Sequence, residues 1–256
     1  MCAIRRLLGF CFVIAVVVPV SGATTWKRVA TISGHECSGR TFILEIPADW
    51  HAAGEFSRLR IQSSGLPEFV LTSDSGWTKY RDFIPLTLRS RLRNLVNSQY
   101  LYCTSVPFGK TDRTLLFVIG WPYASSPGSV HVIQLEGNRA PVVVFRKDEF
   151  EVSDLIDLDG DGKPEIVGRP CLSQEWGDHL LTYAPSHVYI LQSGVPEVFS
   201  EALSRRYNSE HSYGWAGKDC SDKLAVVLHP PGGGKPRIME ARDAEKLSST
   251  KTPAKK

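Results

Sequence analysis

The stretch RIQSSGLPEFVL (residues 60–71) consists of two short apolar segments joined by a turn that contains Gly65. A glycine-containing connection between two such segments predicts a β-hairpin. The stretch ILQSGVPEVFS (190–200) repeats the order of strand, glycine turn, Pro-Glu and second strand, and VIQLEGNRAPVVVF (132–145) is a looser copy with a longer turn. Units that recur at a spacing of about 50 residues and bury their faces against one another are typical of β-propellers and other stacked arrays.

The rest of the chain extends this pattern. Short segments rich in β-branched and aromatic residues alternate with Gly, Pro, Ser and Asn, which predicts an all-β architecture. The predicted strands are 40–47, 58–64, 68–73, 114–121, 129–136, 141–147, 164–170, 186–193, 196–201 and 223–229. We therefore expect a small or incomplete β-propeller-like array of antiparallel blades over residues 24–236, with about four units.

Two segments depart from the β-pattern. Residues 85–99 carry apolar side chains at helical spacing, which predicts one short amphipathic helix packed on a sheet. The apolar positions are Leu88, Leu92, Leu95 and Val96. The arginines between them form either a solvated face or an anion-binding patch. Residues 237–256 are basic and poor in core-forming side chains, so we expect a disordered tail there.

The first residues have the layout of a secretory signal peptide over 1–23. A basic start is followed by an apolar run at 7–20 and by the small residues Ser-Gly-Ala. A membrane-spanning helix is the alternative, but it needs about 20 apolar residues, and Pro19 interrupts the end of this run. No second run of that kind follows. We expect no transmembrane segment in the mature chain, and a secreted, periplasmic or cell-envelope location.

Cysteine usage agrees with export. Four cysteines follow the predicted signal peptide: Cys37, Cys103, Cys171 and Cys220. An even count in an oxidising compartment predicts two disulfides, for which three pairings exist. Pairing of neighbours, Cys37 with Cys103 and Cys171 with Cys220, keeps the closed loops local and is the preferred arrangement, with free buried thiols as the alternative. A zinc site is not favoured because no two cysteines have the close spacing that such sites use.

The stretch SDLIDLDGDGKPEIVG (153–168) crowds carboxylates at alternate positions. Without a cation these groups repel one another and raise one another's pKa values, whereas calcium binds six to eight oxygen ligands in flexible geometry. The predicted ligands are the carboxylates of Asp157, Asp159, Asp161 and Glu165 and the backbone carbonyl of Lys163, whose own charge we expect to point outward. Gly162 permits the sharp turn, since glycine adopts positive φ without steric cost. The loop 157–165 therefore predicts a Ca²⁺ site.

Two kinds of calcium loop fit an Asp-x-Asp-x-Asp-Gly start. The helix–loop–helix kind needs an acidic residue at loop position 12, where this chain has Gly168 within an expected strand. The remaining sequence, DLDGDGKPEIVG, resembles the calcium-binding loop of FG-GAP and VCBS repeats, which occur in integrin α-chain propellers. The resemblance implies calcium in a hairpin loop between blade strands. It covers residues 151–170 closely and 60–200 weakly, and this chain carries one acidic loop where the family often has several.

A search for catalytic motifs gave none. The seven histidines are scattered, with no His-Glu-x-x-His pair, and no Gly-x-Ser-x-Gly elbow occurs. The net charge of +3 becomes nearly neutral without Arg5 and Arg6, which argues against general nucleic-acid binding. We therefore expect an exported, calcium-binding interaction module with a protein or glycan ligand rather than an enzyme. An exported hydrolase acting on a glycan or related polymer is the alternative, since its two carboxylates are defined by distance in space.

Aromatic side chains in loops give a second indication of binding. Trp121, Trp176, Trp215, Tyr123 and Tyr213 lie in or beside predicted loops. Exposed aromatics on loops favour recognition of a ligand, whereas packing between sheets is the alternative.

Overall fold

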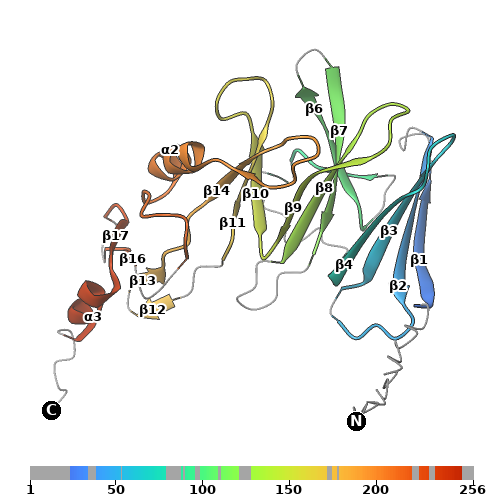
Figure 1. The fold of residues 1–256 in the computed structure, drawn as a ribbon. Coiled ribbons are helices and arrows are strands. Elements are labelled where there is room, and N and C mark those ends of the chain that lie inside the picture. The colour runs from blue at the N-terminus through green and yellow to red at the C-terminus, as the bar shows by residue number, and fades with distance from the viewer. Residues whose placement is uncertain are drawn as a thin grey trace, which may run out of the picture.

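The fold is given by a computed structural model, which describes most of the chain after residue 23. The described residues are 24–33, 39–52, 54–78, 88, 90–95, 99–108, 111–120, 128–171, 175–177, 179–220, 225–230 and 234–249. Within these ranges, four antiparallel sheets account for the strands, and two helices accompany them. In Figure 1 the sheets follow one another along an open arc from β1 at one end to α3 at the other. The all-β, propeller-like prediction is confirmed.

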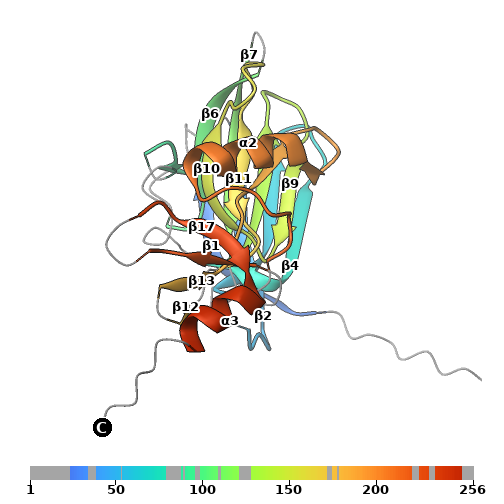
Figure 2. The ribbon, with the colours of Figure 1, turned by 90° about the vertical axis from the view of Figure 1, so that its left-hand side faces the viewer.

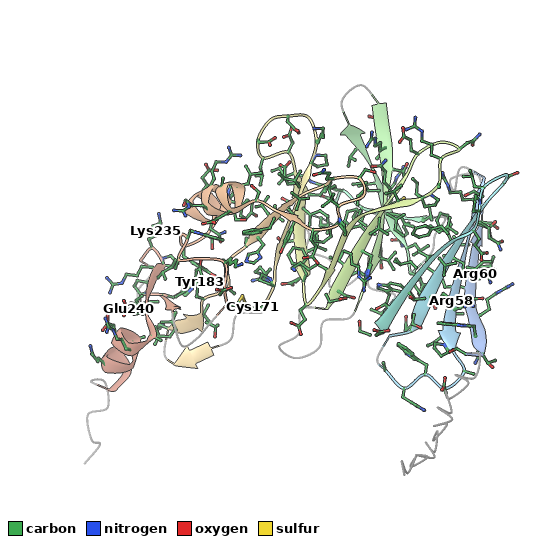
Figure 3. The ribbon with its side chains drawn as sticks, viewed as in Figure 1. Arg58, Arg60, Cys171, Tyr183, Lys235 and Glu240 are labelled. Atoms are coloured by element: carbon green, nitrogen blue, oxygen red, sulfur yellow. A yellow bond between two sulfur atoms is a disulfide. The ribbon has the colours of Figure 1, made fainter. Side chains whose placement is uncertain are left out.

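The first sheet is a four-stranded meander in the order β1-β2-β3-β4. Its strands are β1 (Trp26–Ser33), β2 (Arg40–Pro47), β3 (Phe56–Ser63) and β4 (Phe69–Trp77). One face packs into the core, and the other carries the labelled arginines of Figure 3, Arg58 and Arg60. Both bond to the carboxylate of Glu45, and Arg60 also pairs with Glu68 at 2.7 Å. Charged cross-strand pairs on the outer face and apolar residues on the inner face give this sheet its alternation.

The second sheet lies next to the first and has the order β5-β6-β7-β8-β9. Its strands are β5 (Arg93–Asn94), β6 (Tyr102–Phe108), β7 (Thr111–Ile119), β8 (Ser129–Leu135) and β9 (Val142–Asp148). Every residue of β8 is buried. The reason is that β8 contributes to two cores at once. Val130 and Val132 belong to the core shared with the third sheet, and Ile133 and Leu135 to the core shared with the first.

The third and fourth sheets are interleaved along the chain, in the orders β10-β11-β14-β15 and β12-β13-β16-β17. The third contains β10 (Glu151–Ile156), β11 (Glu165–Arg169), β14 (His187–Ile190) and β15 (Val198–Phe199). The fourth contains β12 (Glu175–Gly177), β13 (Leu180–Thr182), β16 (Ala225–Leu228) and β17 (Arg237–Glu240). The chain therefore leaves the third sheet after β11, returns to it at β14, and leaves it again before β16.

A disulfide joins the two segments in which the chain leaves the third sheet. Cys171 follows β11, Cys220 precedes β16, and the two are bonded, 49 residues apart in sequence. Figure 3 places Cys171 and Tyr183 together where the third sheet adjoins the fourth. This half of the predicted disulfide pattern is confirmed. Cys103 is buried in the core of the first two sheets, whereas Cys37 lies outside the described residues, so their pairing stays a prediction.

The predicted repeat has a structural counterpart in its turns. In the hairpin β3–β4, Leu66 N–H donates to the carbonyl of Ser63 at 3.2 Å, and Gly65 has φ +73°. In the hairpin β14–β15, Val195 N–H donates to the carbonyl of Gln192, also at 3.2 Å. The glycine between them, Gly194, has φ +78°. Both turns therefore need a left-handed backbone conformation at the same position, and only glycine adopts that conformation readily.

Helix α2 (Glu201–His211) packs on β14 through polar groups. Ser204 Oγ accepts the N–H of Val188 at 2.9 Å and donates to the carbonyl of Ser200. The amide of Asn208 donates to the carbonyl of Ser186 at 2.7 Å and accepts its N–H at 3.0 Å. Figure 2 shows α2 lying across β10 and β11 of the third sheet. The helix thus completes the hydrogen bonding beside β14, where the short β15 does not reach.

The helix predicted over 85–99 is wrong in its extent. Among the described residues of this segment there is one helical turn, in which the carbonyl of Leu88 accepts the N–H groups of Arg91 and Leu92. Arg93–Asn94 then form β5 and pair with Tyr102–Cys103. Strand pairing of β5 with β6 therefore outweighs the helical spacing of the apolar side chains in this segment. Leu88 and Leu95 are buried in different cores, one on each side of the second sheet.

The disordered tail predicted from residue 237 is wrong for residues 237–249. They form β17 and helix α3 (Ala241–Ser249), and α3 contacts β16 and β17. Ala241 and Ala244 pack with Leu180 and Val226 in a small separate core. The predicted strand 196–201 is also shortened, because Ser200 caps α2 by accepting the N–H of Leu203. Residues 250–256 and the predicted signal peptide 1–23 lie outside the described part of the chain.

The described helices are short. Neither helix of the described ranges has the length and apolar composition needed to cross a membrane.

Candidate metal centre

The acidic loop connects two paired strands of the third sheet. Ile156 at the end of β10 pairs with Glu165 at the start of β11, so residues 157–164 form the hairpin connection. A register shift between Val152 and Asp154 twists β10 shortly before it enters the loop. The prediction of a hairpin loop running directly into a strand is confirmed.

Three carboxylates come together in this loop. One oxygen from each of Asp157, Asp159 and Glu165 lies within 4.8 Å of the others. Asp157 and Asp159 are exposed, whereas Glu165 is buried with 1% of its surface accessible. In the part of the chain that the structure describes, no other group of three His, Cys, Asp or Glu side chains meets this criterion. An oxygen-only cluster suits a hard cation such as Ca²⁺.

The backbone of the loop is folded around Asp157. Its Oδ1 accepts the N–H of Gly160 at 2.7 Å, and its Oδ2 accepts the N–H of Gly162 at 3.0 Å. Asp159 Oδ1 accepts the N–H of Asp161 at 3.0 Å. Gly160 and Gly162 have φ +79° and +81°, and both are in the left-handed region that glycine favours. The predicted need for glycine at Gly162 is confirmed, and Gly160 shares it.

Glu165 shows the electrostatic cost of this arrangement. Burial raises the pKa of Glu165 to about 6, and the negative charges of Asp159, Asp157 and Asp161 add to the rise. A hydrogen bond from the N–H of Leu158 to Oε2, 2.7 Å long, acts in the opposite direction. The ionised form of this buried carboxylate is therefore disfavoured beside the two others, and a cation coordinated by Glu165 would stabilise it.

Asp161 and Lys163 lie at the exposed side of the loop and bond to each other. Lys163 Nζ donates to Oδ2 of Asp161 at 2.8 Å, and its backbone N–H donates to Oδ1 at 2.8 Å. The Lys163 side chain lowers the pKa of Asp161, and Asp161 raises the pKa of Lys163. We expected the charge of Lys163 to point outward, but it turns back onto the loop because Asp161 is the nearest acceptor. The structure does not bring Asp161 into the cluster of three.

A cavity of about 390 Å³ adjoins the loop and is lined by Asp157, Gly162 and Pro164 on one side. The other side includes Val106 of β6 and Arg91, so the cavity lies between the second sheet and the third. Arg91 donates from Nη1 to the carbonyl of Leu155, and its Nε lies 3.7 Å from Asp154 Oδ1. Sequence reasoning did not connect this arginine to the loop, since it lies in the turn before β5, more than 60 residues earlier in the chain.

Some of the histidines and loop aromatics that raised other possibilities pack within the fold. His187 Nε2 lies 2.7 Å from the carbonyl of Lys218, and burial lowers its pKa. Tyr213 exchanges hydrogen bonds with the backbone of Ala184, and its ring packs on Tyr183 with centroids 6.0 Å apart. Trp121 and Tyr123 lie outside the described residues, and the side chain of Trp176 is not described either. The ring of Trp215 lies beside that of His187, with centroids 6.4 Å apart, so the loop aromatics whose side chains are described pack against neighbouring rings.

Comparisons of the chain with protein-family models, with curated proteins and with solved structures give no significant match.

Proposed function

We propose that the loop 157–165 binds a single Ca²⁺ and that the chain is an exported, propeller-like binding module braced by this cation. The gathering of Asp157, Asp159 and Glu165 within 4.8 Å carries the proposal. The buried position of Glu165 supports it, because a buried carboxylate is stabilised by a cation that coordinates it. The likeness of DLDGDGKPEIVG to the loops of FG-GAP and VCBS repeats supports the choice of calcium.

The proposed ligand set adds Asp161 and the carbonyl of Lys163 to the three gathered carboxylates. Asp161 joins the set when its carboxylate exchanges the ammonium group of Lys163 for the cation. Both residues are exposed, so this exchange moves no buried group. The resulting set consists of oxygen atoms alone, and calcium accepts such sets in irregular geometry more readily than magnesium does.

The cation acts as a structural element in this proposal. It would close the hairpin β10–β11 and fix the wall of the cavity that Asp157 and Gly162 form against the second sheet. Both oxygens of Asp157 already hold backbone N–H groups, which suits a residue that organises a loop. Export is supported by the Cys171–Cys220 disulfide, since such bonds persist in oxidising compartments.

Calcium titration of the purified protein tests the proposal. We expect isothermal calorimetry to give one Ca²⁺ per chain, tighter than Mg²⁺, and thermal unfolding to shift upward by mass action. Asp159→Ala and Glu165→Gln should abolish both effects. Asp112→Asn, which changes an exposed carboxylate of β7, is the matched control and should retain them. Equal midpoints in calcium and in chelator for the unsubstituted protein would overturn the proposal.

A further inference from the structure

A second cavity lies between the first and second sheets, away from the acidic loop. Its volume is about 450 Å³, and its lining comes from β4, from β8 and β9, and from the residues beside them. The residues that matter for its chemistry are Ser73, Asp74, Ser129, Arg146, Asp148 and Glu149. This volume is within the range of small-molecule sites.

A bulge in β4 forms one wall of the cavity. Trp77 pairs with Phe56, whereas Thr72 pairs with Arg58, so residues 73–76 stand out from the ladder. Bulges of this kind redirect side chains and often adjoin functional sites.

The bulge is held by close contacts. Ser73 Oγ accepts the N–H of Gly76 at 3.1 Å and lies 3.3 Å from Ser75 Oγ. A Cβ atom on Gly54 would lie 2.7 Å from Cα of Gly76, so both positions require glycine. The wall is therefore a fixed surface rather than an open loop.

The floor of the cavity contains a buried hydroxyl group without a partner. Ser129 lines the cavity and is 4% exposed, and its Oγ has no hydrogen-bond partner. His131 follows on the same face of β8 and is fully buried. Its Nδ1 accepts the indole N–H of Trp77 at 3.1 Å, so the neutral ring carries its proton on Nε2, which is also without a partner. Of these two groups only Ser129 lines the cavity, and a buried hydroxyl group without a partner is costly unless a ligand uses it.

Charged side chains surround this floor. Arg146 is the cross-strand partner of His131, and Asp148 is that of Ser129, so all four project to the same face. Asp74 comes from the opposite wall, and Glu149 follows with φ +53°, an uncommon value for a residue other than glycine. Side-chain hydrogen bonds and ion pairs are recorded for none of these charged groups within the described ranges.

The arrangement excludes some ligands. The three carboxylates are not gathered within metal-ligand distance, as those of the acidic loop are, so a single bare cation does not account for them. Three carboxylates against one guanidinium make the lining negative, which disfavours phosphates and other anions. The lining offers donors and acceptors side by side, and a hydroxyl group satisfies both because it donates and accepts.

We propose that this cavity binds a polyhydroxylated small ligand, namely a neutral or amine-bearing monosaccharide unit. Hydroxyl groups of the ligand would donate to Asp148 and Asp74 and accept from Arg146, and rotation of the Ser129 hydroxyl group, which is shielded in the free protein, would bring it to one of them. The site uses no residue of the acidic loop, so it goes beyond the calcium proposal and can fail or succeed independently of it.

Saturation-transfer NMR of the full protein tests this proposal. The probes are glucose, galactose, mannose and their 2-amino derivatives, with glucuronate as the anionic comparison. We expect transfer to at least one neutral or amino sugar, none to glucuronate, and the same result in calcium and in chelator. The variants Ser129→Ala and Asp148→Asn should weaken binding tenfold or more. Transfer to none of the six sugars, or transfer unchanged in both variants, would overturn the proposal.

Matched controls separate a binding defect from a folding defect. Ser63→Ala removes another buried hydroxyl group without a partner, at the far end of β3, and Asp112→Asn removes an exposed carboxylate of β7. Both should bind as the unsubstituted protein does. Thermal unfolding of Ser129→Ala should show no loss of stability, because the substitution removes a polar atom that has no partner in the free protein. A large drop in the midpoint would mean that Ser129 is a structural residue, and the proposal would fail.

Discussion

Trp77 donates its indole N–H to Nδ1 of His131 at 3.1 Å, and the two rings meet edge to face with centroids 5.2 Å apart. This contact joins the first sheet to the second inside their common core. Only a neutral imidazole ring can accept the bond, since both nitrogens of a protonated ring are donors. The contact is therefore tied to the protonation of one buried side chain.

Stability should depend on pH through His131. Burial lowers the pKa of His131 to about 4, the charge of Arg146 adds to the fall, and Asp148 opposes it. Because the unfolded chain takes up the proton first as the pH falls, the contribution of His131 to the free energy of unfolding should be constant well above pH 6.5. It should then decrease by roughly 3 kcal/mol between pH 6.5 and 4. Urea denaturation at a series of pH values measures this slope.

A variant isolates the contribution of His131 from those of other titrating groups. His131→Gln keeps an acceptor for Trp77 but does not titrate, so its decrease in stability between pH 6.5 and 4 should be smaller by the same roughly 3 kcal/mol. His211→Gln, at an exposed position near the end of α2, should keep the original slope. Identical slopes in all three proteins would contradict the assignment.

The hydrogen bonds of Asn208 should contribute substantially to the free energy of unfolding. Asn208→Ala would leave the N–H and carbonyl of Ser186 without their partner, and we expect a loss of about 1–3 kcal/mol in the free energy of unfolding. Ser209→Ala on the exposed side of the same helix should change stability by less than about 0.5 kcal/mol. Chemical denaturation of the two variants side by side gives the comparison, and equal losses would show that Asn208 has no special role.

Reduction of the Cys171–Cys220 disulfide should destabilise the fourth sheet first. A cross-link spanning 49 residues is expected to contribute about 4 kcal/mol by restricting the unfolded chain. The small core around Leu180 and Val226 has little apolar surface to replace that contribution. Hydrogen exchange of the reduced protein should show lost protection in the fourth sheet and retained protection in β8. Uniform loss over all four sheets would instead indicate a single cooperative unit.

Substitution of Gly160 should couple loop conformation to calcium. Gly160→Ala places a Cβ at φ +79°, which costs about 1–2 kcal/mol, although no atom lies within 4 Å of that Cβ. Calcium affinity, measured by calorimetry, should fall as well, because the loop would relax away from its turn at Asp157. Gly160→Asn is the matched comparison, since asparagine tolerates the left-handed region, and it should lose less. Equal effects of the two variants would show that side-chain bulk rather than backbone conformation matters.

The sequence predicted the parts of the fold that local chemistry determines. Gly65 and Gly194 occupy left-handed positions in equivalent turns, and the glycine in each stretch predicted its hairpin. The acidic loop could also be predicted, because Asp157 and Gly162 contact each other within one hairpin. The array of about four antiparallel units followed from these repeated hairpins.

The features that the sequence did not predict depend on long-range contacts or on unusual polarity. Helix α2 was missed because its buried positions are Ser204 and Asn208, which leave no apolar stripe to detect. Residues 237–249 became ordered by packing on strands that precede them by many residues. The cavity floored by Ser129 is formed by a bulge in another sheet, and Arg91 reaches the acidic loop from a distant segment. No local pattern encodes such meetings.

The complete burial of β8 has a consequence for how the sequence can vary. An ordinary strand with one wet face tolerates exchange at every second position, but Ser129–Leu135 has no such position. A saturation-mutagenesis map of the chain should therefore show an unbroken band of intolerance to bulky or charged side chains at β8, as it should over Leu115–Ile119 of the neighbouring β7, whose five residues are also buried. Within that band, drift among homologues would be restricted to swaps of equal volume, so β8 is the segment by which distant relatives of this chain are most readily traced.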